Sequence, residues 1–245
     1  MRKSIFYTMK RSVLGLDLAT RRYRDIGIAI VQEEGEQINC HFLRPGRPQF
    51  TDPPTVASLA AYIDEVANEV GVTLIAIDGP QAWKAPDNGL QHQRVSEKAL
   101  HTQAKTGLPG ICKPASSLRF VQFAIDFYSA LEARGWQRQQ IATELAEKTI
   151  IEVFPTAAWR GLGYKPLPAK PACSVEQVNE WLACLNAIFP LSLAQSPTHD
   201  ELQALMAGIV GLAFGRGSGY CSYGVTPFLA EGYWREGFIV NLCAE

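Results

Sequence analysis

Four acidic residues stand where a folded chain usually places apolar side chains or begins a helix. Asp17 interrupts the strand-like run SVLGLDLA, and Asp78 closes the apolar run VTLIAID. Glu152 lies inside TIIEVF, and Asp200 lies in the first turn of the helix that THDELQALMAGIVGLAFG predicts. A carboxylate in an apolar strand costs free energy unless it is paired or bound. The alternative for Asp78 is a simple turn before Gly-Pro, and for Glu152 it is an edge strand facing water.

Carboxylates that converge from distant parts of a chain predict a metal site. If Asp17, Asp78 and Asp200 meet, two of them about 4 Å apart repel by roughly 4 kcal/mol at an effective dielectric constant of 20. Such a cluster needs protons or cations. Oxygen ligands without His or Cys favour Mg²⁺ or Mn²⁺ over zinc, and paired metals serve in-line attack of water on a phosphodiester. The pattern therefore predicts a metal-dependent hydrolase, a nuclease, with these three aspartates as metal ligands.

A stripe of small residues would bring Asp200 to the strand of Asp17. Positions 200, 204, 208, 211 and 215 fall on one helical face and read Asp, Ala, Gly, Gly, Gly. In the strand, Gly15 and Ala19 share a face with Asp17, because alternate residues of a strand point the same way. Two faces of small residues allow close packing, so we expect the helix to lie on this strand with Asp200 beside Asp17.

The remaining elements predict an α/β domain. We expect strands at 12–19, 26–32 and 37–43 in an antiparallel meander, followed by a helix at 52–71 and a parallel strand at 72–80. Further elements are expected in this order: helices at 93–103, 116–135 and 139–148, a strand at 149–154, helices at 174–190 and 198–215, and a strand within 231–242. This is the order of a ribonuclease H-like domain, a mixed five-stranded sheet with three antiparallel strands and then parallel strands, flanked by helices. We expect one such domain over 1–245, with a loop and helix insertion at about 81–147.

Composition limits the classes of protein that remain. The 245 residues include 23 basic and 24 acidic residues, which gives a net charge of −1. This charge argues against a generally basic surface that binds nucleic acid non-specifically, but it is compatible with a local basic patch. The six cysteines lack CxxC or zinc spacing, so we expect reduced, mostly buried thiols. No secretory signal or membrane-spanning run is present, which predicts a cytoplasmic protein without a membrane partner. Met1 and Met9 both remain possible starts.

Six short motifs occur in the order typical of one family. They are GLDLA, AIDGP, RVSEKAL, IEVFP, HDELQAL and EGFIV, and together they span most of the chain. In the order and spacing of these motifs, the chain resembles a family of predicted ribonuclease H-like nucleases, the family called domain of unknown function 429. The resemblance implies a fold related to the Holliday-junction resolvases, a nucleic-acid partner and acidic residues that chelate divalent metal. It implies Asp17, Asp78 and Asp200 as the first-strand, central and helix carboxylates, and Glu152 as a further catalytic acid.

Polar side chains near these motifs are candidates for substrate binding: Arg94, Glu97, Lys98, His199 and Gln203. The first three lie on or near one helical face, where they hold a substrate phosphate or simply pair as surface charges. His199 adjoins Asp200, where it could shuttle protons or contact phosphate. The family often has a second Asp where this chain has Gln203, about 60° round the helix from Asp200. A neutral amide there weakens metal binding.

Two other functions remain open at this stage. The first is a non-catalytic nucleic-acid or ligand-binding module on a ribonuclease H-like fold, motivated by Gln203 and by the near-zero net charge. The second is a nucleotide-binding protein of the actin and sugar-kinase type, because GLDLAT resembles the first phosphate motif of that group. Against it, IDGPQAW lacks the expected Asp-x-Gly-x-Gly of the second phosphate loop. The type of nucleic acid and the oligomeric state are not predicted.

Overall fold

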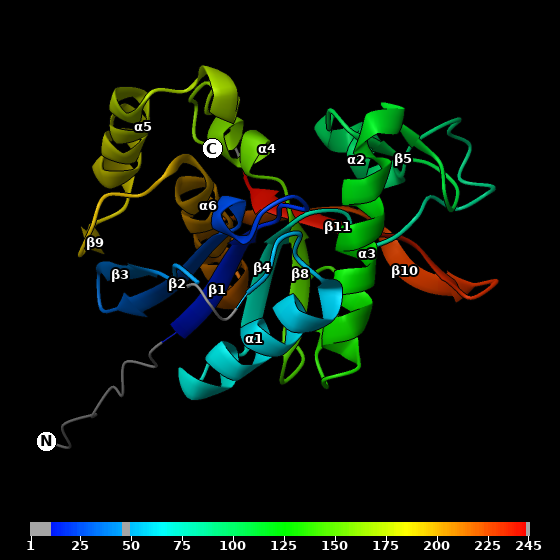
Figure 1. The fold of residues 1–245 in the computed structure, drawn as a ribbon, viewed down its shortest axis with the longest axis horizontal. Coiled ribbons are helices and arrows are strands. Elements are labelled where there is room, and N and C mark those ends of the chain that lie inside the picture. Colours follow the sequence, from blue (N-terminus) through cyan, green and yellow to red (C-terminus); the bar gives the residue numbers. More distant parts are fainter. Residues whose placement is uncertain (1–10, 46–49, 244–245) are drawn as a thin grey trace, which may run out of the picture.

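The computed structural model of the protein describes residues 11–45 and 50–243, which form a mixed sheet with helices on both faces (Figure 1). The sheet starts with an antiparallel meander of β1 (Arg11–Asp17), β2 (Gly27–Glu34) and β3 (Gln37–Phe42). Gly35, at a φ of 64°, makes the two-residue turn between β2 and β3 possible. A 3-10 turn, η1 (Tyr23–Asp25), links β1 to β2. The meander is confirmed as predicted.

Parallel strands continue the sheet on the other side of β1. They are β4 (Leu74–Asp78), β8 (Thr149–Val153) and β11 (Tyr233–Leu242), each parallel to the strand before it. The sheet order is β10-β11-β8-β4-β1-β2-β3-β9, and β7 pairs with β8 outside this path. The five predicted core strands and the strand predicted within 231–242, which is β11, all belong to a sheet that has nine strands among the described residues, so the predicted number of five strands was wrong.

The three additional strands lack a residue pattern from which they could be predicted. Two are very short, β7 (Gln137–Arg138) and β9 (Leu191–Leu193). The long edge strand β10 (Tyr220–Ala230) leaves most of its side chains partly or fully exposed, so apolar and polar residues do not alternate along it. Its antiparallel pairing with β11 brings Cys221 and Cys243 together as a disulfide with a Cα–Cα distance of 5.3 Å. The expectation that all six cysteines are reduced was therefore wrong for this pair.

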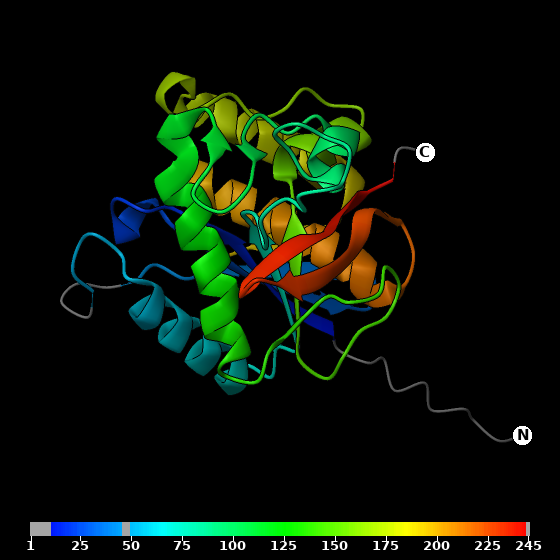
Figure 2. The same ribbon diagram turned by 90° about the vertical axis from the view of Figure 1, so that its right-hand side faces the viewer.

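Helices cover both faces of the sheet (Figures 1 and 2). One face carries α6 (His199–Arg216), with α4 (Pro155–Gly161) and α5 (Val175–Ile188) packed around it. The other face carries α1 (Val56–Glu69) and α3 (Leu118–Glu132). Helix α4 was not predicted; it begins at a proline directly after β8, which suits the first turn of a helix. No helix of the described chain has both the length and the apolar character that a bilayer crossing demands.

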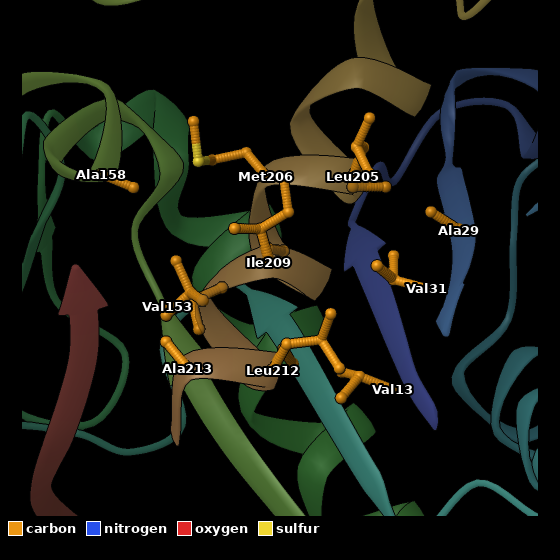
Figure 3. Packing of buried hydrophobic residues seen from close by; sticks show 14 of the residues in the cluster. Val13, Ala29, Val31, Val153, Ala158, Leu205, Met206, Ile209, Leu212 and Ala213 are labelled. Atoms are coloured by element: carbon orange, nitrogen blue, oxygen red, sulfur yellow. The ribbon is translucent and has the colours of Figure 1, made fainter. Parts of the chain in front are cut away.

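The small-residue stripe of α6 packs as predicted. A methyl group on Gly15 would collide with the backbone of Ala204 and Gly208, and one on Gly211 would lie 2.5 Å from Cγ1 of Val13. Larger side chains beside the stripe complete the core, and Figure 3 shows Leu212 lying against Val13. Backbone contact at this range needs glycine, so the stripe places the amino end of α6 close to the carboxyl end of β1.

The segment between β4 and β8 joins the sheet through β11. It contains α2 (Val95–Leu100), β5 (Lys105–Thr106), β6 (Cys112–Lys113) and the 3-10 turn η2 (Ala115–Ser117). The backbone N–H of Trp83 donates to the carbonyl of Trp234, and that of Glu236 donates to the carbonyl of Trp83 at 2.7 Å. The buried carboxylate of Glu236 accepts from the backbone N–H groups of Ala85 and Val95. These bonds fix the segment on the sheet beside the ends of β4 and β8.

The predicted helix at 139–148 does not form. Its residues run as turns and irregular backbone before β8. Ile141 and Leu145, which would give the helix its apolar side, are about half exposed at 50% and 45%. A short helix without a buried apolar face is not stable by propensity alone, which explains the difference.

Candidate active site

Asp17 and Asp78 lie side by side at one edge of the sheet. They are the last residues of β1 and β4, and the parallel register of these strands pairs them directly. Paired residues of neighbouring strands point to the same face. Asp17 shares its face with Gly15 and Asp78 with Ala76, and both of these residues contact the stripe of α6. The two carboxylates therefore lie at the end of the face that α6 covers.

Helix α6 brings a third carboxylate to this edge. Its first turn is held by a capping box in which Thr198 and Glu201 each accept a backbone N–H bond from the other residue. The backbone of Asp200 packs directly on Gly27, where no side chain would fit. One oxygen of Asp17, one oxygen of Asp200 and one ring nitrogen of His199 all lie within 4.8 Å of one another. The predicted convergence of Asp17 with Asp200 is present in the fold.

These carboxylates are electrostatically unfavourable as anions. Burial, with repulsion from Asp78 and Asp200, raises the pKa of Asp17 well above its usual range, and Lys170 opposes this in part. Burial, followed by repulsion from Glu152, raises the pKa of Asp78 to about 7. Within residues 11–45 and 50–243, no group donates a hydrogen bond or forms an ion pair to either carboxylate. A bound cation would supply the missing positive charge.

The ring of His199 is oriented as a ligand would be. Its Nε2 lies 2.9 Å from the carbonyl oxygen of Pro168, which can only accept, so Nε2 carries a proton. In the neutral ring Nδ1 then has a lone pair, and it lies 3.2 Å from Oδ1 of Asp200, another acceptor. A shared proton or a cation between them resolves this contact. The donor set therefore includes an imidazole in addition to the oxygen ligands predicted from the sequence.

Lys170 is a member of the site that the sequence analysis missed. Its ammonium group contacts Oδ1 of Asp25 at 2.9 Å and forms a short ion pair with Oδ2 of Asp200. Burial lowers the pKa of Lys170, but the hydrogen bonds to Asp200 and Asp25 outweigh it and raise the pKa overall. Lys170 lies in the 3-10 turn η3 (Lys170–Ala172), thirty positions before Asp200. No sequence pattern around KPLPAKPA distinguishes it from an ordinary surface lysine.

Glu152 is not part of this cluster. Its neighbour Ile150 packs in the core under α1 and α3, so the alternation of β8 directs Glu152 to that face and away from α6. Arg94 binds its carboxylate through both terminal nitrogens, at 2.7 and 2.5 Å. The backbone N–H of Gln81 donates to it at 2.9 Å. Glu152 is thus neither a free metal ligand nor exposed on an edge strand.

The predicted substrate-binding residues divide into three kinds of environment. Arg94 and Glu97 are only 1% and 2% exposed, and they pair with each other at 3.1 Å. They form a buried charge network with Glu152 and are not the surface pair considered from the sequence. Lys98 is exposed on α2. The side-chain oxygen of Gln203 accepts a hydrogen bond from Nε1 of Trp159 at 3.1 Å, so that oxygen is occupied in packing.

Comparisons with known proteins give only distant structural likenesses. No protein-family model matches the chain, and no curated protein does so. A structure of Thermus thermophilus RuvC aligns with a TM-score of 0.39 and 14% identity, over 84% of this chain and 95% of that one. A structure of T. thermophilus RuvC in complex with a Holliday junction substrate aligns with a TM-score of 0.39 and 15% identity, over 84% and 94%. The junction in that complex is a ligand of RuvC.

Proposed function

We propose that this chain is a metal-dependent nuclease that hydrolyses phosphodiester bonds of nucleic acid on a ribonuclease H-like domain. The observation that carries the proposal is the group of Asp17, Asp78 and Asp200 at one edge of the sheet. Within the described residues, Asp17 and Asp78 neither accept a hydrogen bond nor form an ion pair. Chains rarely retain such repulsion without a ligand that offsets it. The order of the central strands, three antiparallel and then two parallel, supports the domain type and its extent over the chain.

The residues present suit a divalent cation. Asp17, Asp200 and Nδ1 of His199 would hold it, with Asp78 adjacent, and the carbonyl of Pro168 would keep His199 in the right tautomer. A bound Mg²⁺ or Mn²⁺ would activate water and neutralise charge on the phosphate. Imidazole as a third ligand favours Mn²⁺ more than an all-oxygen set would.

Asp78 has the properties of a proton acceptor in this proposal. In the metal-free chain its pKa of about 7 lies close to neutral pH, where a general base is most effective. It lies beside the proposed metal ligand Asp17. We therefore propose that Asp78 accepts the proton of the attacking water.

Basic residues around the site would bind the backbone of the nucleic acid. Arg21 and Arg24 are exposed in the turn that follows β1, and Arg119 at the start of α3 donates to the carbonyl of Thr20 in the same turn. Guanidinium groups in such a position hold phosphates without reading sequence. The buried Tyr23 in this turn is part of the core and would not stack on a base. We propose a cytoplasmic location, where nucleic acid is accessible.

One observation favours the second candidate, a non-catalytic binding module. Lys170 already neutralises Asp200, and Gln203 contributes no charge to the site. In that case the chain binds nucleic acid but neither takes up divalent metal nor cleaves.

A cleavage screen separates the two. Labelled DNA, RNA, hybrid and branched substrates are incubated with the purified chain in Mg²⁺, Mn²⁺ or EDTA. We expect metal-dependent cleavage of at least one substrate, lost in Asp17→Asn and Asp200→Asn and kept in Asp126→Asn, an exposed aspartate of α3. Cleavage that survives Asp17→Asn, or binding without cleavage under all conditions, contradicts the nuclease proposal.

A further inference from the structure

A cavity of about 310 Å³ borders Asp78 beside the carboxylate cluster. We infer that it takes one unpaired nucleobase of the nucleic-acid substrate, an inference that rests on the proposed function. The volume is near the lower end of the range of small-molecule sites. A nucleotide whose base enters this cavity would place its phosphate at the cavity mouth, next to Asp78 and the proposed metal ligands.

The apolar walls of the cavity suit a flat ring. Phe120 of α3 and Phe154, the residue before α4, provide aromatic side chains, and Pro80 and Pro114 add further apolar surface. Aromatic side chains stack on nucleobases with little dependence on sequence. A sugar or a phosphate alone would gain nothing from these walls.

The polar part of the cavity disfavours a phosphate and favours a base with N–H donors. It consists of the buried network of Arg94, Glu97 and Glu152, one cation and two anions. Four of the five guanidinium N–H bonds of Arg94 already donate to these two carboxylates. The network thus carries a net charge of about −1. Four N–H donors already fill the oxygens of Glu97, so the acceptors left for a ligand are Oε1 of Glu152, which takes a single donor, and the carboxylate of Asp78 at the cavity wall. The exocyclic amine of adenine, cytosine or guanine matches these acceptors.

The cavity is pre-formed, because its polar residues are fixed by the backbone. Glu97 accepts from the backbone N–H of Thr106 at 2.9 Å and from that of Arg94 at 3.0 Å. Glu152 is held by the N–H of Gln81 as well as by Arg94. A base that binds here must be unpaired, since its hydrogen-bonding edge faces the protein. The inference therefore names a single-stranded or extruded nucleotide as the substrate at the cleaved position.

The test uses nucleosides, which lack the phosphate that the carboxylates would repel. Binding of adenosine, purine riboside and ribose to the metal-free full chain is measured by ligand-observed NMR. We expect adenosine to bind, purine riboside, which lacks the exocyclic amine, to bind several-fold more weakly, and ribose not to bind. Equal binding of adenosine and ribose, or no binding of adenosine at millimolar concentration, overturns the inference.

Variants locate the binding in this cavity. Ala104→Trp fills it from the wall, and Ala115→Trp places the same side chain on an exposed position outside it. We expect adenosine binding to be lost in the first variant and kept in the second. If Ala104→Trp does not fold, as judged by circular dichroism, Phe120→Ala serves instead, with binding expected to weaken about 5-fold to 100-fold. Unchanged binding in a folded Ala104→Trp or Phe120→Ala variant overturns the inference.

The outcome is distinguishable from that of the proposed function. The nucleoside assay contains no metal and measures no cleavage. A chain that binds adenosine in this cavity but cleaves nothing refutes the nuclease proposal alone. A chain that cleaves but binds adenosine no better than ribose refutes the base pocket alone.

Discussion

Asp17→Asn should make the metal-free protein more stable and should remove its response to divalent metal. The wild-type chain holds Asp17 near Asp200 and Asp78 without a described donor, so folding brings these carboxylates together at a cost. An asparagine keeps the shape of the side chain and removes its charge. Most substitutions of buried polar residues destabilise a protein, so an increase in stability is a specific signature of repulsion.

The structure sets the size of this effect. One oxygen of Asp17 lies within 4.8 Å of one oxygen of Asp200. At that distance and an effective dielectric constant of 20, two full charges repel by about 3.5 kcal/mol. The folded chain avoids part of this cost in two ways. The raised pKa of Asp17 lowers the negative charge that it carries, and Lys170 forms an ion pair with Asp200. We therefore expect Asp17→Asn to raise the free energy of unfolding by about 1–3 kcal/mol at pH 8 in EDTA.

The pH dependence of the wild-type protein tests a second carboxylate of the site, Asp78, whose pKa is raised by burial and by Glu152. Asp78 has a pKa of about 7 in the folded chain and an ordinary value near 4 when unfolded. Between these values the folded state holds a proton that the unfolded state has released. The free energy of unfolding in EDTA should therefore fall as pH rises from about 4 to about 7. Saturating Mg²⁺ or Mn²⁺ should reverse the loss above pH 7.

Urea unfolding followed by circular dichroism measures all of these values. Asp126→Asn is the matched control, because Asp126 is exposed on α3 and its change should stay within about 0.5 kcal/mol. The reasoning is refuted if Asp17→Asn destabilises the metal-free protein, since Asp17 would then be a needed structural acceptor. It is refuted equally if the variant gains as much stability from Mn²⁺ as the wild type does.

Three further predictions concern other parts of the fold. Lys170→Gln should tighten Mn²⁺ binding a few-fold to about ten-fold, because the ammonium competes for the same carboxylate; unchanged or weaker binding by calorimetry would show that it does not compete. Gly208→Ala should lower the free energy of unfolding by about 1–3 kcal/mol through overpacking against β1 and β2. Gly215→Ala is the control, because its methyl group would have its nearest neighbour at 3.8 Å, and it should leave the stability unchanged or raise it by up to about 1 kcal/mol. Equal losses of stability in the two variants would contradict the close packing of the glycine stripe on the sheet. Arg94→Met should cost about 3–5 kcal/mol by leaving buried carboxylates unpaired, and adding Glu152→Leu should restore part of it. No recovery in that double variant would mean that Arg94 acts mainly through packing.

Much of the central fold could be predicted from local patterns. Short apolar runs between turn residues define β1 and β2, alternating apolar residues define β3, and the small-residue stripe of α6 predicts which strand it packs on. The alternation and the stripe depend on spacings of two and of three to four residues, which a sequence displays directly. The same spacings placed Asp17 beside Asp200, a contact that joins residues more than 180 positions apart.

Partner choice and register were decided only by the tertiary structure. The side of the sheet that Glu152 occupies depends on how β8 aligns with β4, and a shift of one residue would reverse it. Lys170 reaches Asp200 through an irregular segment without periodicity. Arg94 is buried only because the segment after β4 folds onto β11. Cys221 meets Cys243 because of the pairing of β10 with β11. Such contacts depend on long-range pairing energies that no local spacing records, whereas the positions of the isolated acidic residues within apolar runs were visible in the sequence itself.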